Sequence, residues 1–156
     1  MEIIILYGSS CVGKSALMKN MPNNNIIKVE VDDCEYWRHE EEQWEAVSIE
    51  YLKKKINENR DDIDMVFTCG GLPLPDHQIY KHLTEKHNIN FLHILVVSKS
   101  MELYKAQIVL RGREKIMDQL IKDHEWRESN KHLYDKILIN LNVETLNFIK
   151  NINETE

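Results

Sequence analysis

The sequence predicts a single α/β domain in which helices cover both faces of a parallel sheet. Five runs rich in apolar, β-branched residues alternate with segments whose apolar residues recur at helical spacing. The length of 156 residues allows one hydrophobic core and is too short for a second. Strand, helix and strand repeated in this way give a three-layer sandwich with right-handed crossovers.

The predicted strands are residues 3–7, 26–31, 65–68, 91–97 and 136–139. The first and the fourth are almost continuously apolar, which is typical of central parallel strands that are covered on both faces. We therefore expect these two strands in the middle of the sheet.

Three segments between the strands carry apolar stripes at helical spacing. The stripes are Trp44, Val47, Tyr51, Leu52 and Ile56; then Ile79, Tyr80 and Leu83; then Ile116, Met117, Leu120 and Ile121. Asp76 follows Pro73 and Pro75, so we expect it to be the N-cap of the second of these helices.

The charge pattern argues against a partner of duplex nucleic acid. The formal net charge is −6, whereas a DNA-binding protein usually presents a basic face. The densest basic run, residues 53–55, is matched by Glu40, Glu41, Glu42 and Glu45 in what reads as the same helix. We interpret the run as a solvated helix face.

The sequence also predicts a cytoplasmic protein without a membrane partner. Its longest apolar runs have the length of strands, and the N-terminus enters a strand without the basic region of a secretory signal. Cys11, Cys34 and Cys69 lack the spacing of a zinc site or a disulfide framework and suit a reducing compartment.

A phosphate-binding motif follows the first predicted strand. It matches the pattern GxxxxGK[ST], with a predicted helix beginning at its lysine, and reads Gly8-Ser9-Ser10-Cys11-Val12-Gly13-Lys14-Ser15. Gly8 and Gly13 allow a tight turn in which backbone N–H groups surround an anion. Lys14 is expected to reach the β- and γ-phosphates, and the Ser15 hydroxyl to bind Mg²⁺. The motif predicts binding of a nucleoside triphosphate.

The sequence lacks the other signatures of two classes of phosphate-loop protein. A GTPase would carry NKxD after a middle strand, but the fourth strand is followed by Ser98-Lys99-Ser100-Met101. A motor ATPase would end a strand in Asp-Glu, but the third strand runs into Cys69-Gly70-Gly71. The remaining expectation is a kinase.

A carboxylate pair, Asp32 and Asp33, ends the second strand. In an open parallel sheet the carboxyl edge is where ligands bind, so Asp32 is expected to face the γ-phosphate. There it can accept a proton from an attacking hydroxyl and help to hold Mg²⁺. One member of the pair can instead cap the following helix, and the sequence leaves both roles open.

Taken together, "GSSCVGKS", "VDDCEYWR", "TCGG" and "VLRGRE" resemble the small P-loop kinases of the nucleoside-monophosphate-kinase-like group, such as shikimate kinase, gluconate kinase, chloramphenicol phosphotransferase and the polynucleotide 5′-kinase domain. The resemblance implies the P-loop NTPase fold with strand order 2-3-1-4-5 in one domain, residues 1–156. It also implies Asp32 as the base, Arg38 and Gly70-Gly71 at the acceptor, and a lid at residues 111–128 with Arg111 and Arg113 on the triphosphate.

The lid arginines also have a simpler interpretation as surface residues paired with Glu114. As lid residues they would neutralise charge on the transferred phosphoryl group, a contact worth about 10³–10⁵ in rate where an arginine finger supplies it. The chain departs from shikimate kinase after the second strand, where Trp37 and Trp44 flank an acidic stretch, so we expect another acceptor. Trp44 fits a core position, and Trp37 is a core residue or a stacking platform.

These observations predict an ATP-dependent kinase that transfers the γ-phosphate to a hydroxyl of a small molecule or nucleotide, with Mg²⁺ as cofactor. The nucleobase is expected between the lid arginines and the segment that begins at Asn140. The alternative is a nucleotide-binding regulator or a simple NTPase, in which Asp32 serves only the metal.

Overall fold

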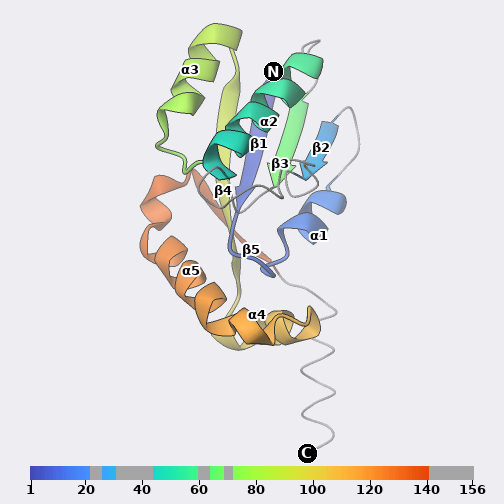
Figure 1. Cartoon of the computed structure of the whole chain (residues 1–156), viewed down its shortest axis with the longest axis vertical. Coiled ribbons are helices and arrows are strands. Elements are labelled where there is room, and N and C mark those ends of the chain that lie inside the picture. Colours follow the sequence, from blue (N-terminus) through green and yellow to red (C-terminus); the bar gives the residue numbers. More distant parts are fainter. Residues whose placement is uncertain (22–25, 31–43, 60–63, 69–71, 141–156) are drawn as a thin grey trace, which may run out of the picture.

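The computed structural model describes residues 1–21, 26–30, 44–59, 64–68 and 72–140, with helices on both faces of one sheet (Figure 1). The strands are β1 (Glu2–Tyr7), β2 (Ile26–Glu30), β3 (Asp64–Thr68), β4 (Asn90–Ser98) and β5 (Lys136–Asn140). The helices are α1 (Lys14–Lys19), α2 (Trp44–Glu58), α3 (Gln78–His87), α4 (Met101–Leu110) and α5 (Met117–Ser129), with 3₁₀ turns at Glu114–Ile116 and Lys131–Leu133. All five predicted strands are present.

The sheet is wholly parallel and has the order β2-β3-β1-β4-β5, which confirms the predicted topology. β1 lies in the centre, where Ile5 is in register with Phe67 of β3 and with His93 of β4. The carboxyl ends of the strands point to the lower edge of the sheet in Figure 1, where α4 and the segment after β1 also lie. This edge is where a parallel sheet binds its ligands.

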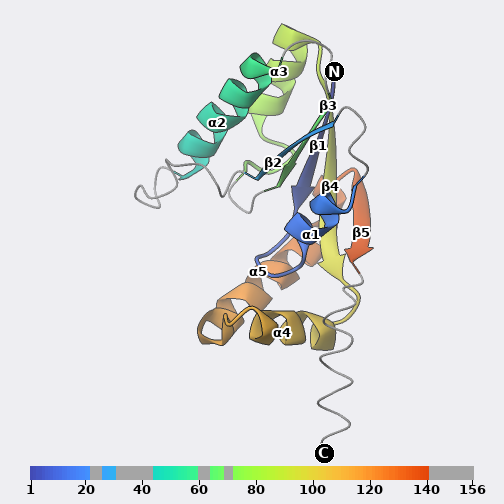
Figure 2. The same ribbon diagram turned by 90° about the vertical axis from the view of Figure 1, so that its right-hand side faces the viewer.

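Alternate residues of β1 enter two hydrophobic clusters, one on each face of the sheet. Ile3, Ile5 and Tyr7 pack with residues of α2 and α3, which lie side by side over one face (Figure 2). Leu6 packs on the opposite face with residues of α1, α4 and α5. Because both faces are covered, β1 and β4 carry the nearly continuous apolar runs seen in the sequence.

The predicted helical stripes form the covering layers. Leu52 and Ile56 of α2 are buried, as are Ile79, Tyr80 and Leu83 of α3 and Leu120 of α5. The side chain of Trp44 lies outside the described part of the structure, so its predicted core position stays a prediction. No helix within the described ranges combines the length and the apolar character needed to cross a bilayer.

The predicted N-cap of α3 is wrong by one residue. The cap is His77, whose Nδ1 accepts a hydrogen bond of 3.1 Å from the Ile79 N–H, and Asp76 lies in the preceding turn. An imidazole nitrogen can replace a carboxylate oxygen because the cap needs only an acceptor within reach of the first free amides.

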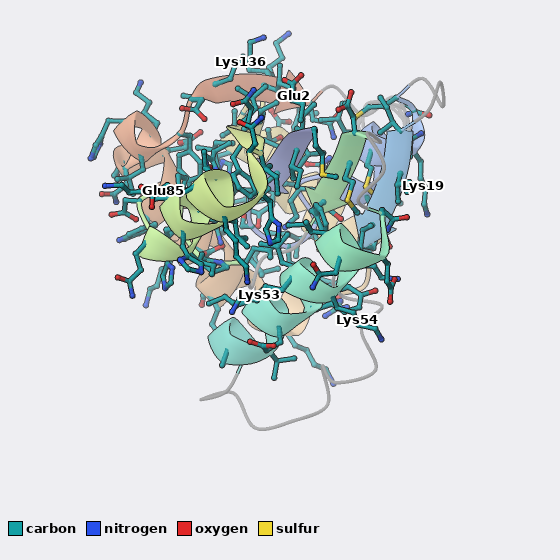
Figure 3. The ribbon with its side chains drawn as sticks, turned by 90° about the horizontal axis from the view of Figure 1, so that it is seen from above. Glu2, Lys19, Lys53, Lys54, Glu85 and Lys136 are labelled. Carbon is teal, nitrogen blue, oxygen red and sulfur yellow. The ribbon has the colours of Figure 1, made fainter. Side chains whose placement is uncertain are left out.

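The lysine run of α2 lies on the surface of the helix, with Lys54 exposed and Lys53 and Lys55 half-buried (Figure 3). Its described ion pairs lie within the helix: Lys53 contacts Glu50 at 3.5 Å, and Lys54 and Lys55 contact Glu58 at 4.0 and 3.4 Å. The predicted partners at positions 40–42 lie outside the described residues.

Candidate phosphate-binding site

The phosphate-binding motif is a compact loop between β1 and α1 at the carboxyl edge of the sheet. The Val12 N–H donates to the Ser9 carbonyl at 3.3 Å, which closes a tight turn. Cys11 and Gly13 have left-handed backbone conformations, with φ angles of 70° and 99°. Residues of this conformation within a turn curl successive N–H groups toward one side, the arrangement that forms an anion-binding nest.

The loop amides are available to a ligand. Within the described part of the chain, the N–H groups of Ser10, Cys11 and Gly13 donate to no backbone carbonyl. Amide groups of this kind seek an acceptor, and phosphate oxygens are strong acceptors. The geometry therefore fits the predicted triphosphate.

The two motif glycines are required by close contacts. A Cβ atom on Gly8 would lie 2.8 Å from both Val12 Cγ1 and the Val96 carbonyl oxygen of β4. A Cβ atom on Gly13 would lie 2.0 Å from Nδ2 of Asn140, and the φ angle of 99° is itself unfavourable for other residues. A side chain at Gly8 would press on the backbone of β4, whereas one at Gly13 would displace the Asn140 amide and strain the backbone.

Lys14 and Ser15 begin α1 directly after the loop, as predicted. The Lys14 ammonium group donates to the carbonyl of Gly8, so its side chain reaches back across the loop that it follows. The Ser15 side chain is half-buried in the first turn of α1. A hydroxyl oxygen at this position is a suitable ligand for Mg²⁺, which prefers oxygen.

Asn140, the last residue of β5, holds the loop by hydrogen bonds to its backbone. Its side-chain amide donates to the carbonyls of Val12, at 3.1 Å, and Gly13, at 3.5 Å. The sequence had suggested this residue only as the start of a nucleobase-binding segment. No local signal indicates the contact, because 128 positions separate Asn140 from Val12.

Two side chains from the helices after β4 contact the same loop. Tyr104 of α4 donates its hydroxyl proton to the Ser10 carbonyl at 2.7 Å, and burial raises its pKa to about 12. His124 of α5 lies with Nδ1 3.4 Å from the Ser9 hydroxyl and with Nε2 3.3 Å from a Glu128 oxygen. Burial lowers the pKa of His124, against the opposing effect of the Glu128 carboxylate. Both residues were missed by the sequence analysis.

Gln107 of α4 is a third residue that the sequence did not indicate. Its side chain is 4% exposed, and its Nε2 lies 3.8 Å from the position of a Cβ on Gly13. Its Oε1 is buried and has no hydrogen-bond partner among the described residues. An unsatisfied amide oxygen beside a ligand-binding loop is a polar group available to a bound molecule.

The two predicted lid arginines flank the turn that ends α4. Gly112 has a φ angle of 68°, its N–H donates to the Val109 carbonyl, and the Arg113 N–H donates to the Ile108 carbonyl. This pair of bonds is the Schellman motif, which stops the helix at a left-handed glycine. Arg111 and Arg113 are both exposed, on either side of Gly112. Their exposure leaves both side chains accessible to a ligand, and their catalytic role stays a prediction.

Comparison with known proteins identifies the fold. No protein-family model matches the sequence, and no curated protein is significantly similar to it. The crystal structure of shikimate kinase from Bacteroides thetaiotaomicron matches 98% of this chain and 96% of its own, with a TM-score of 0.55 and 16% identity. That of an uncharacterized protein from Eubacterium ventriosum ATCC 27560 matches 98% and 99%, with a TM-score of 0.58 and 12% identity. This chain has the fold of shikimate kinase.

In this P-loop fold the predicted acceptor residues follow two neighbouring strands. Asp32, Asp33, Arg38, Gly70 and Gly71 lie outside the described residues, so their roles stay predictions. The strand ends that lead to them are described: Glu30 of β2 is in register with Thr68 of β3, which is in register with Leu6 of β1. β2 and β3 therefore end at the edge of the sheet that carries the P-loop.

A buried polar chain runs beside the P-loop on the α3 face of the sheet. Tyr7, the residue before the loop, has its hydroxyl 2.8 Å from Nδ1 of His93 and 2.9 Å from the Tyr80 hydroxyl. Tyr80 donates to the Pro73 carbonyl at 2.5 Å. These hydrogen bonds connect the segment after Gly71 to the central strands β1 and β4.

Proposed function

We propose that this protein is an ATP-dependent kinase that transfers the γ-phosphate of ATP to a hydroxyl of a small molecule or nucleotide. The observation that carries the proposal is the loop between β1 and α1 at the carboxyl edge of the sheet, where the N–H groups of Ser10, Cys11 and Gly13 donate to no backbone carbonyl of the described residues. The shared fold of shikimate kinase, a phosphotransferase by name, supports it.

The donor side of the reaction follows from the loop. The N–H groups of Ser10, Cys11 and Gly13 would hold the β- and γ-phosphates together with the Lys14 ammonium. Ser15 and Asp32 would hold Mg²⁺, which would neutralise charge on the phosphates when bound. Arg111, with Arg113 beside it, would approach the phosphoryl group as its charge develops during transfer.

The groups proposed to bind the acceptor follow β2 and β3 in the sequence. Asp32, two residues after the end of β2, would accept the proton of the attacking hydroxyl, while Arg38, Gly70 and Gly71 would line the acceptor pocket. The exchange is balanced: the hydroxyl oxygen forms a bond to the γ-phosphorus, the bond from that phosphorus to the bridging oxygen breaks, and ADP leaves with the charge. Water would be a poor substitute for an acceptor that these groups orient.

The deciding experiment is acceptor-dependent turnover. ATP labelled at the γ-phosphate is incubated with the protein, Mg²⁺ and a panel of sugars, nucleosides, oligonucleotide ends and antibiotics. We expect the label to move onto one class of hydroxyl compound, with little release of free phosphate in its absence. The Lys14→Ala variant is the control for contaminating kinases. Release of phosphate at a rate that no compound changes would identify a simple NTPase instead.

A further inference from the structure

We propose that Tyr104 is a positioning residue for the P-loop: its hydroxyl fixes the Ser10–Cys11 peptide so that the Cys11 N–H faces the bound phosphates. The inference rests on the proposed nucleotide binding and adds to it a residue outside the motif. It also makes α4, which ends at the arginine turn, part of the nucleotide site.

The first support is the geometry of the peptide bond. A peptide group is planar and trans, so its C=O and N–H point in opposite directions. The Ser10 carbonyl points to the Tyr104 hydroxyl, at 2.7 Å, and the Cys11 N–H therefore points to the other side of the loop. That N–H donates to no backbone carbonyl within the described residues, as expected for a group that awaits a ligand.

The second support is the conformation of Cys11. Its φ angle of 70° lies in the left-handed region, where a residue with a Cβ atom is disfavoured. Such a conformation persists only where surrounding contacts hold it. The Tyr104 hydrogen bond acts on the peptide that ends at Cys11, so it opposes relaxation of the backbone toward a negative φ.

The third support is that Tyr104 itself is fixed. Its side chain is fully buried, and its ring centroid lies 4.6 Å from that of His124. Its hydroxyl also lies 3.4 Å from the Leu120 carbonyl of α5, a longer contact than the one to Ser10. The helix that carries it is capped by Ser100, whose hydroxyl accepts from the Leu103 N–H at 3.1 Å. The hydroxyl is therefore held in place by two helices before any ligand arrives.

The test compares the loss of one hydroxyl in two backgrounds. Tyr104→Phe removes only the oxygen, and Cys11→Gly removes the Cβ atom that makes a positive φ unfavourable. Binding of MgATP is measured by calorimetry for the parent, both single variants and the double variant. We expect Tyr104→Phe to weaken binding about 3–10-fold in the parent. In the Cys11→Gly background, the double variant is compared with the Cys11→Gly single variant. There we expect Tyr104→Phe to weaken MgATP binding less than twofold.

Tyr134→Phe is the matched control. Tyr134 is also buried, and its hydroxyl accepts a hydrogen bond of 3.3 Å from Arg127 without contact to the loop. We expect this variant to keep the parent affinity for MgATP even where its melting temperature falls as far as that of Tyr104→Phe. Equal losses of affinity in the two tyrosine variants would assign the effect to general destabilisation and overturn the proposal. Equal effects of Tyr104→Phe in the two Cys11 backgrounds would do the same.

A crystal structure of the nucleotide-free Tyr104→Phe variant separates this inference from the proposed function. We expect the φ angle of Cys11 to leave the left-handed region in that structure. An unchanged angle near 70° overturns the inference even if the protein is a kinase. If the parent protein binds no MgATP, the proposed function fails, and the crystal structure still decides whether Tyr104 sets the loop conformation.

Discussion

The hydroxyl of Tyr7 lies 2.8 Å from Nδ1 of His93, and the direction of this hydrogen bond follows from its neighbours. A carbonyl only accepts, so the single proton of Tyr80 is donated to Pro73. The proton of Tyr7 must then be the one shared with Tyr80, and His93 donates from Nδ1 to Tyr7. A neutral imidazole with its proton on Nδ1 satisfies these hydrogen bonds. Burial lowers the pKa of His93, which favours this neutral form.

The two buried histidines predict a loss of stability in mild acid. Burial lowers the folded-state pKa of both His93 and His124 below the ordinary value of 6.5. Below that value the unfolded chain binds more protons than the folded one, so the free energy of unfolding decreases as the pH falls. Each histidine contributes at most about 1.4 kcal/mol per pH unit. Urea unfolding at pH 7.5 and 5.5 measures the difference.

Substitution of each histidine tests whether it causes this pH dependence of stability. We expect His93→Gln and His124→Gln each to reduce the difference between the two pH values. His82→Gln, at an exposed position of α3, should leave it unchanged. The same pH dependence in all four proteins would place its origin in other groups.

Lys14→Ala is expected to abolish phosphate transfer and to weaken MgATP binding. The Lys14 side chain reaches back across the loop to the Gly8 carbonyl. Its ammonium group is the point charge assigned to the β- and γ-phosphates. Calorimetry and the transfer assay measure the two effects. Unchanged affinity and turnover would remove the loop from the nucleotide site.

Arg111→Ala is expected to lower kcat far more than it raises the KM for ATP. A contact that strengthens as charge develops acts on the transition state, and its loss leaves ground-state binding largely intact. Arg113→Ala, across the glycine turn, is the comparison and should have the smaller effect. If only KM rises, Arg111 contributes to ground-state binding alone.

Asp32→Asn is expected to retain ATP binding and to lower transfer by about 10²–10⁴ because the base is lost while the shape is kept. Asp33→Asn should cost much less activity, since neighbouring side chains of a strand point to opposite faces. Steady-state kinetics of both variants gives the comparison. Equal losses would show that both carboxylates serve the metal, and a larger loss at Asp33 would reverse the assignment.

Asn140→Ala is expected to weaken MgATP binding about 3–10-fold and to lower stability by about 1 kcal/mol, because the Val12 carbonyl loses its donor. Calorimetry and urea unfolding measure the two quantities. Asn130→Ala is the control, since Asn130 also donates to a carbonyl, that of Trp126 at 2.8 Å, but at the end of α5. A parent-like affinity in Asn140→Ala would show that the loop keeps its shape without this support.

The fold was predictable because its signals are local. Each strand is an apolar, β-branched run, and the sequence around Lys14 carries its chemistry within a few residues. The cap of α3 was missed because Asp76 and His77 are adjacent acceptors, and only the backbone path decides between them.

The supports of the loop were not predictable from local patterns. Tyr104 reads as one more core aromatic residue of an apolar helix, and Asn140 as a polar residue after a strand. Their roles depend on contacts 94 and 128 positions away in the chain. Such contacts leave no periodicity or spacing in a single sequence, because packing of the finished sheet creates them.

The order of the strands has a consequence for how the protein is made. β1 leaves the ribosome first, yet its neighbours in the sheet are β3 and β4, and the Val12 carbonyl is held by Asn140. A partly synthesised chain therefore contains the whole phosphate-binding motif but lacks the groups that shape it. The loop would then gain its full support only when the fifth strand is in place, so the phosphate-binding motif is synthesised well before the contacts that hold it.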